Sequence, residues 1–275
     1  MKTDYLPYMN FAKQLAYRAG RITLSYFDKG IHADLKADES PVTAADRAAE
    51  EFVRGEIEKA YPTHAIVGEE FGEKAGAGNP FRWIVDPIDG TKSFIRGVPT
   101  YSVLIALEVE GVVRASAVCF PAMDKLLYAG EGLGAWENGK RAHVSNVSNL
   151  KDAVFTFTSW SGFRTRKRLD VFENLHRDCF FCRGWSDAYG YYLVATGRAE
   201  IYLDPGVKIW DVAPFPIILK EAGGFFGSWE GEEGHTFEEG LAVNAALRSE
   251  VLKLTRAKRP AAKPKSEAKK KVRRK

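Results

Sequence analysis

The chain has 275 residues, enough for one large domain or two modest ones with an apolar core. Apolar residues make up 45% of it and the net charge is +4, but this charge is unevenly distributed. From Arg256 onward, 11 basic residues and one acidic residue give +10, so the rest of the chain carries −6. The mildly acidic body therefore lacks the overall basic charge of a nucleic-acid-binding protein.

Membrane insertion and a disulfide framework are also disfavoured. No uncharged apolar run approaches the roughly 20 residues needed to span a bilayer, and the N-terminus lacks the apolar core of a signal peptide. The three cysteines are Cys119, Cys179 and Cys182, an odd number that favours a reducing cytoplasm. Cys179 and Cys182 form a lone CxxC pair, for which structural cysteines are the simpler interpretation.

Residues 1–147 are predicted to form an α+β domain with an antiparallel sheet. Apolar residues at helical spacing predict a helix over 4–28, and a hairpin or loop follows at 34–40. Thr43 to Asp46 resembles a capping box that opens a second helix. A Gly-rich loop is expected at 72–80. Strands are predicted at 65–67, 101–108, 112–120 and 125–129, with a further turn and short strand at 130–141.

Residues 148–256 are predicted to form a second, α/β domain, because strands and helices alternate. Strands are expected at 154–158, 199–203 and 241–245, and helices at 166–175, 189–196, 212–222 and up to Leu254. Pro214 and Pro216 should delay or distort the helix after Asp211. Residues 257–275 have no apolar periodicity and are predicted to be a disordered basic tail.

The rest of the chain is organised around the segment from Trp83 to Phe94. An apolar run that is typical of a buried strand ends at Asp86, and Asp89 follows three residues later. Gly90 permits a sharp backbone turn, and a helix that opens at Thr91 would direct its free amides at whatever the carboxylates hold. Carboxylates that face an anion-binding helix end indicate a metal and a phosphate.

Two further acids, Glu69 and Asp211, also lie at the ends of apolar segments. Buried carboxylates are costly unless a cation compensates their charge. The predicted ligands are all oxygen atoms, with the Ile88 carbonyl available between Asp86 and Asp89, and such a set suits Mg²⁺ better than Zn²⁺. The five histidines show no paired spacing, which also argues against zinc.

Three motifs in this order resemble the inositol monophosphatase family. They are Gly68-Glu69-Glu70, Asp86-Pro87-Ile88-Asp89-Gly90-Thr91, and Trp210-Asp211-Val212-Ala213 followed by Glu221-Ala222-Gly223-Gly224. The resemblance covers about residues 5–250. It implies a layered αβαβα fold of the inositol monophosphatase and fructose-1,6-bisphosphatase type, a homodimer, and hydrolysis of a phosphomonoester by a metal-activated water.

The resemblance also implies roles for individual residues. The metal ligands would be Glu69, Asp86, the Ile88 carbonyl, Asp89 and Asp211. Asp46 would hold a further Mg²⁺ through water; the alternative is that it serves only in the helix cap with Thr43. Glu69 and Thr91 would orient and deprotonate the attacking water, and the amides of Gly90 and Thr91 would bind the phosphate.

The segment from Arg183 to Tyr192 is similar to the histidinol-phosphate phosphatases of the same family. Asp187 would suit the ammonium and imidazole of histidinol, Arg183 and Ser186 would help to bind the substrate, and Asp204 would complete the pocket rim. The alternative is that Arg183 and Asp187 only pair with each other on the surface.

We therefore expect an enzyme that uses Mg²⁺ to hydrolyse L-histidinol phosphate. Inositol 1-phosphate, or a broad range of sugar and nucleotide phosphates, is the alternative substrate within the family. A different class of function also stays open: a non-catalytic protein that binds phosphorylated ligands, or nucleic acid through its basic tail.

Overall fold

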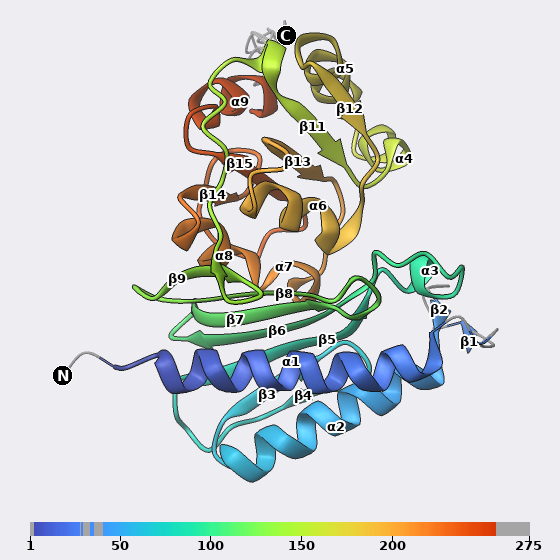
Figure 1. Cartoon of the computed structure of the whole chain (residues 1–275), viewed down its shortest axis with the longest axis vertical. Coiled ribbons are helices and arrows are strands. Elements are labelled where there is room, and N and C mark those ends of the chain that lie inside the picture. The colour runs from blue at the N-terminus through green and yellow to red at the C-terminus, as the bar shows by residue number, and fades with distance from the viewer. Residues whose placement is uncertain (1–2, 28, 30–33, 36–40, 257–275) are drawn as a thin grey trace, which may run out of the picture.

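The computed structural model describes residues 3–27, 29, 34–35 and 41–256, which form five stacked layers (Figure 1). Helices α1 (Leu6–Tyr26) and α2 (Ala44–Ala60) cover one face of a large sheet. Helices α6 (Asp187–Ala195), α7 (Ile209–Val212) and α8 (Phe215–Glu221) lie between this sheet and a smaller one. The outer face of the smaller sheet packs against α4 (Trp160–Thr165), α5 (Leu169–Asp178) and α9 (Arg248–Thr255). The predicted α/β fold with αβαβα layering is confirmed.

The first layer forms where local signals in the sequence are strong. Helix α1 buries a stripe of residues at helical spacing, namely Met9, Ala12, Leu15, Ala16 and Ala19. Helix α2 begins at the predicted capping box, in which the Asp46 carboxylate accepts the Thr43 amide at 2.8 Å. Between the helices, β1 (Asp34–Leu35) pairs antiparallel with β2 (Pro41–Val42); the predicted turn at 36–40 lies outside the described residues.

Among the described residues, the large sheet has the strand order β10-β9-β8-β7-β6-β5-β3-β4. All neighbours are antiparallel except β3 and β5. The strands are β3 (Ala65–Gly68), β4 (Gly72–Lys74), β5 (Phe81–Asp89), β6 (Ser102–Val109), β7 (Val112–Phe120), β8 (Lys125–Gly130), β9 (Gly134–Glu137) and β10 (Lys140–Arg141). Strand β4 corrects the prediction of an uninterrupted loop at 72–80. It is a short, exposed edge strand, which periodicity does not reveal.

The smaller sheet has the order β12-β11-β13-β15-β14. Strands β12, β11 and β13 run parallel, so their carboxyl ends lie at one edge, where loops commonly carry functional residues. Strands β15 and β14 run antiparallel to their neighbours. The bounds are β11 (Val154–Phe157), β12 (Phe181–Arg183), β13 (Ile201–Asp204), β14 (Gly224–Gly227) and β15 (Gly240–Asn244). The sequence analysis did not predict β12 and β14.

The remaining helices are α3 (Thr91–Phe94), α4 (Trp160–Thr165), α5 (Leu169–Asp178), α6 (Asp187–Ala195), α7 (Ile209–Val212), α8 (Phe215–Glu221) and α9 (Arg248–Thr255), with 3₁₀ turns at Pro121–Met123 and Leu150–Asp152. Helices α5 and α6 differ from their predicted bounds by a few residues, and α4 was not predicted. The helix predicted over 212–222 is interrupted, because α7 ends at Val212 and α8 begins only at Phe215. Pro214 has no amide to continue the helix, so the expected distortion is found.

Among the described residues, four buried apolar clusters hold the layers together, and the largest of them draws on both sheets. Ile84 and Leu104 of the large sheet join Tyr202 and Ala242 of the small one in a single buried cluster around α6 and α8. Among the described residues, no helix is both long and apolar enough to cross a lipid bilayer. The division at residue 147 stays a prediction, and the tail 257–275 lies outside the described residues.

A buried ion-pair cluster links the large sheet to the loop between β14 and β15. Arg82 donates to both carboxylate oxygens of Glu108, at 3.0 and 2.7 Å, and His235 Nε2 lies 2.8 Å from Glu108 Oε2. Burial alone would raise the pKa of Glu108, but the hydrogen bonds from His235 and Arg82 lower it from 4.5 to about 2. The charged carboxylate therefore stabilises the folded protein.

Replacing Glu108 by glutamine should lower the free energy of unfolding at pH 7 by about 1–3 kcal/mol, because Arg82 and His235 lose a charged partner. The loss should shrink as the pH falls below 4.5 toward 2, since the wild-type carboxylate then becomes protonated as well. Urea denaturation at pH 7, 4 and 3 measures both effects. An equal loss at all three pH values would contradict this prediction.

Candidate active site

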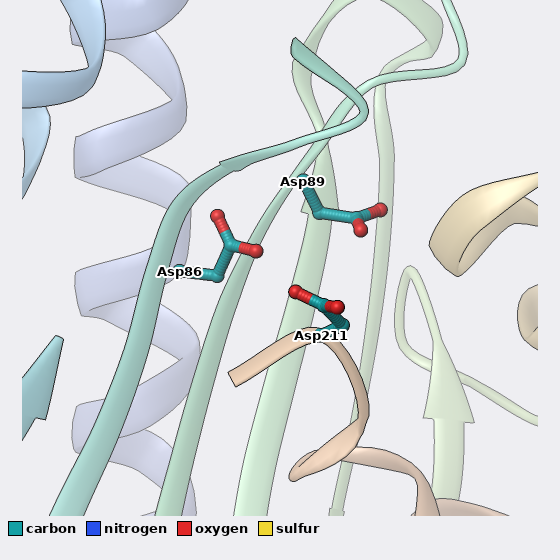
Figure 2. A group of neighbouring side chains, drawn as sticks. All are labelled: Asp86, Asp89 and Asp211. Atoms are coloured by element: carbon teal, nitrogen blue, oxygen red, sulfur yellow. The ribbon is translucent and has the colours of Figure 1, made fainter. Parts of the chain in front are cut away.

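Strand β5 ends in a bulge that brings two aspartates to the same side. Residues three apart in a regular strand point to opposite faces. Here Asp86 pairs with Leu104 of β6 and Asp89 pairs with Ser102, so three steps on β5 match two on β6. Pro87 lies inside this bulge, where the lack of an amide disrupts no ladder hydrogen bond. Both carboxylates consequently point into the same space (Figure 2).

Asp211 reaches this space from the other sheet's side of the molecule. It lies on α7, and its Oδ2 accepts the Lys208 amide at 2.7 Å, which fixes the first turn of that helix. One carboxylate oxygen from each of Asp86, Asp89 and Asp211 lies within 4.8 Å of the other two (Figure 2). Residues that are more than 100 positions apart in the chain thus converge, as the motifs predicted.

The cluster is electrostatically unfavourable without a cation. Burial, followed by the charges of Glu69, Asp89 and Asp211, raises the pKa of Asp86 well above its ordinary value. Burial and nearby carboxylates likewise raise the pKa of Asp89, and they raise that of Asp211 to about 7. Carboxyl groups that resist ionisation together in this way need a compensating positive charge to be ionised at neutral pH.

Glu69 and Asp46 lie at the edge of this cluster. Glu69 follows β3, its amide donates to the Val85 carbonyl at 3.3 Å, and its charge raises the pKa of both Asp86 and Asp211. Asp46 serves as the α2 capping residue, and its charge also acts on the pKa of Asp86. Its position therefore agrees with both of the roles considered from the sequence.

The chain turns sharply immediately after Asp89. Gly90 has a left-handed backbone with φ of 80°, and the four-residue helix α3 follows. The Thr91 hydroxyl donates to the Ile88 carbonyl at 3.1 Å, so these two groups lie side by side at the bulge. The backbone of Gly90 and Thr91 is thereby brought beside the carboxylates.

Asp187 packs against this turn from α6. A Cβ added to Gly90 would lie 3.1 Å from Asp187 Oδ2, which shows how closely the two segments approach. Burial raises the pKa of Asp187, against the hydrogen bond from Ser186 and the charge of Lys92. Asp187 itself has a left-handed φ of 57°, an uncommon conformation that is enriched at functional sites.

Arg183 and Asp204 occupy different surroundings. Arg183 is exposed, donates to the Cys182 carbonyl at 2.8 Å and lies over the Phe181 ring, and no hydrogen bond or ion pair among the described residues joins it to Asp187. Asp204 is buried at the end of β13, and burial with the charge of Asp187 raises its pKa to about 7. Asp204 thus belongs with the acidic cluster, whereas Arg183 lies on the surface.

The residues present fit a hard divalent cation. All of the clustered side-chain donors are carboxylate oxygens, which Mg²⁺ and similar ions prefer. Their raised pKa values show a concentration of negative charge that such an ion would offset. The donor set contains no histidine or cysteine, as zinc sites typically do.

Two supporting groups were not predicted from the sequence. The Ala188 amide at the start of α6 donates to Asp89 Oδ2 at 2.8 Å, and the Ser102 hydroxyl donates to the same atom at 3.3 Å. Ser102 could be found only from the strand register across the bulge, and Ala188 only from the docking of α6 onto β5. Neither signal is present in a local motif.

A buried group of carboxylates between two sheets, beside a tight turn of backbone amides, is typical of enzymes that use divalent cations to hydrolyse phosphate esters. A sequence model of the inositol monophosphatase family matches residues 4–263, so the chain belongs to this family. It is therefore a phosphatase that acts on small phosphorylated substrates.

Individual relatives agree with this assignment. The chain is 41% identical to a histidinol-phosphatase from Chlorobaculum parvum, over 88% of this chain and 93% of the relative. It is 35% identical to a Nus factor SuhB from Pasteurella multocida, over 88% of this chain and 92% of that protein. Among solved structures, the Thermotoga maritima IMPase matches with a TM-score of 0.82 and 30% identity, covering 91% of this chain and 97% of that one.

Proposed function

We propose that this protein is a Mg²⁺-dependent phosphatase that hydrolyses L-histidinol phosphate to L-histidinol and phosphate. The observation that carries the proposal is the convergence of Asp86, Asp89 and Asp211, with the Asp187 carboxylate against the adjoining turn. The first three residues account for the cation. Asp187 supplies a negative charge where the alcohol part of the substrate would lie.

Glu69, Asp86, the Ile88 carbonyl, Asp89 and Asp211 would hold the ions. When bound, Mg²⁺ would acidify the attacking water and offset the charge that develops on the phosphoryl and leaving oxygens. The chain's own groups keep these ligands oriented: the Ile88 amide donates to Asp86 at 3.0 Å, and the Ala188 amide donates to Asp89 at 2.8 Å.

The nucleophile and the phosphate would be positioned by the two turns next to the cluster. Glu69 would accept a proton from the attacking water, and the Thr91 hydroxyl oxygen would accept a hydrogen bond from that water while it donates to the Ile88 carbonyl. Backbone amides of Gly90 and Thr91 would donate to phosphate oxygens. Asp46, near Asp86, would hold a further Mg²⁺ through water.

The choice of histidinol phosphate rests on the charge of the pocket and on the relatives. The partly buried Asp187 and the buried Asp204 add two carboxylates on the α6 and β13 side, and these suit the ammonium and imidazole groups of histidinol. Ser186 donates to Asp187 at 3.2 Å and would hold it in place, while Arg183 would have to rotate from the surface to reach a substrate. The Chlorobaculum parvum relative named above is a histidinol-phosphatase.

Histidinol phosphate should have a kcat/KM at least tenfold above that of inositol 1-phosphate, because a hydrogen bond to a charged group contributes about 1.5–3 kcal/mol. Asp187→Asn should reduce this ratio, since asparagine tolerates the left-handed backbone but lacks the charge. Asp170→Asn, at an exposed acid of α5, is the matched control. Phosphate release from both substrates, with and without Mg²⁺, is the measurement. A wild-type preference for the inositol ester would overturn the choice of substrate.

Inositol 1-phosphate is the second candidate substrate, supported by the likeness to the Thermotoga maritima IMPase. The same acidic cluster would serve either ester, so only the groups around Asp187 separate the two candidates.

The family resemblance also supports a homodimer, which light scattering would test. The three cysteines are all free thiols, which is consistent with a cytoplasmic location.

A further inference from the structure

The carboxylate of Glu50 is fully buried on α2, next to the turn that carries Glu69, and it belongs to none of the groups assigned so far. Its Oε2 accepts the Glu70 amide at 2.7 Å, and its Oε1 accepts the Phe71 amide at 3.2 Å. A buried carboxylate that accepts two backbone amides fixes the path of that backbone. The turn after β3 is therefore held from α2.

Arg54, one helical turn further along α2, also binds both Glu50 and the backbone of this turn. Its Nε donates to Glu50 Oε1 at 2.8 Å, and its Nη2 donates to the Gly72 carbonyl. The Arg54 side chain is only 12% exposed, so the pair is shielded from solvent and its geometry is restrained. The Glu50 carboxylate thus holds the amides of Glu70 and Phe71, and the Arg54 guanidinium holds the carbonyl of Gly72.

Gly68 is the matching feature on the strand. A Cβ added at Gly68 would overlap the Glu50 carboxylate, so only glycine permits this close approach. Gly68 pairs with Val85 and Gly72 in the sheet, and the Glu69 amide donates to the Val85 carbonyl. Glu69 therefore lies between two backbone positions that both contact Glu50.

We propose that Glu50 is a positioning residue that fixes the Glu69 carboxylate for cation binding, with Arg54 and Gly68 completing its seat. The inference rests on the proposed function, because it assigns Glu69 to the cation site. Glu69 directly precedes Glu70, whose amide Glu50 accepts at 2.7 Å, so loss of this hydrogen bond would release the turn that places the Glu69 carboxylate. Groups that orient metal ligands typically affect metal affinity by about 10–100-fold when mutated.

Glu50→Gln is the direct test, because glutamine has the same shape but cannot pair with Arg54 and accept both amides. Isothermal titration of the full-length protein with Mg²⁺ should show at least tenfold weaker binding. In the assay, the Mg²⁺ concentration for half-maximal activity should rise by the same factor, while the KM for the phosphate ester changes less. Gly68→Ala should weaken Mg²⁺ binding in the same direction, although it removes no charge.

Glu108→Gln is the matched control, because it too breaks a glutamate–arginine pair. This pair lies in the large sheet, where Arg82 Nη2 is 2.7 Å from Glu108 Oε2. It should lower the melting temperature yet keep wild-type Mg²⁺ affinity. If Glu50→Gln and Gly68→Ala both lost stability but bound Mg²⁺ as wild type does, the positioning role would be overturned and the proposed function would stand. If the wild type itself bound no Mg²⁺, the proposed function would fail and this inference with it.

Discussion

Replacing Asp89 by asparagine should lower kcat by about a thousandfold or more, because several kcal/mol of transition-state stabilisation depend on the cations that this residue helps to hold. Asparagine keeps an oxygen that can accept the Ala188 amide, which now bonds Asp89 at 2.8 Å. The docking of α6 is therefore preserved, and the lost activity reflects the missing charge. Phosphate release at saturating substrate and Mg²⁺ is the measurement.

The same variant should be more stable than the wild type when Mg²⁺ is absent. Burial and the charges of Asp187 and Asp211 raise the pKa of Asp89, so the folded protein binds that proton more tightly than the unfolded chain does. The ionised carboxylate consequently destabilises the fold at neutral pH, and its removal should contribute about 0.5–2 kcal/mol. A variant with near-normal turnover, or one that melts well below the metal-free wild type, would contradict this account of the cluster.

Chelation of divalent cations should abolish turnover, and Mg²⁺ should restore it. Binding to the folded state alone stabilises the protein by about 2.7 kcal/mol at a ligand concentration 100 times the dissociation constant. For a chain of this size, such a change corresponds to a rise in melting temperature of about 5–10 °C. Thermal unfolding in EDTA and in a Mg²⁺ series, alongside the activity assay, measures both effects.

Asp89→Asn serves as the control for that thermal shift, because it lacks one of the three clustered carboxylates and should respond less to Mg²⁺. The rise in melting temperature should also be measured with Ca²⁺, since Ca²⁺ also binds oxygen ligands but accepts longer and less regular coordination than Mg²⁺. Full activity in the presence of EDTA would show that the acidic cluster has another purpose.

Local sequence patterns predicted the parts of the site that lie within a few consecutive residues. Asp86, Asp89 and Gly90 are close in sequence, so the end of the strand and the tight turn could be inferred from residue type, whereas the bulge between Asp86 and Asp89 was found only in the structure. The convergence of Asp211 with them was available only through the family resemblance, because no local pattern encodes which helix approaches which strand. The structure supplies that docking.

Glu50 illustrates why other features escape sequence reasoning. Glu50 and Arg54 have the i, i+4 spacing of an ordinary ion pair on an exposed helix surface. Only the strand packed against α2 reveals that the pair is buried and holds the turn that carries Glu69. The edge strands β4, β12 and β14 were also missed, because a sheet edge is defined by pairing with a distant strand and not by a local pattern.

The helices between the two sheets determine what would follow from truncation of the protein between them. Tyr202 and Ala242 of one sheet share a buried cluster with Ile84 and Leu104 of the other. A fragment that ended between the sheets would expose this shared interior to solvent and would carry an incomplete set of acids. Such a fragment is therefore expected to lose both its folded structure and its cation site.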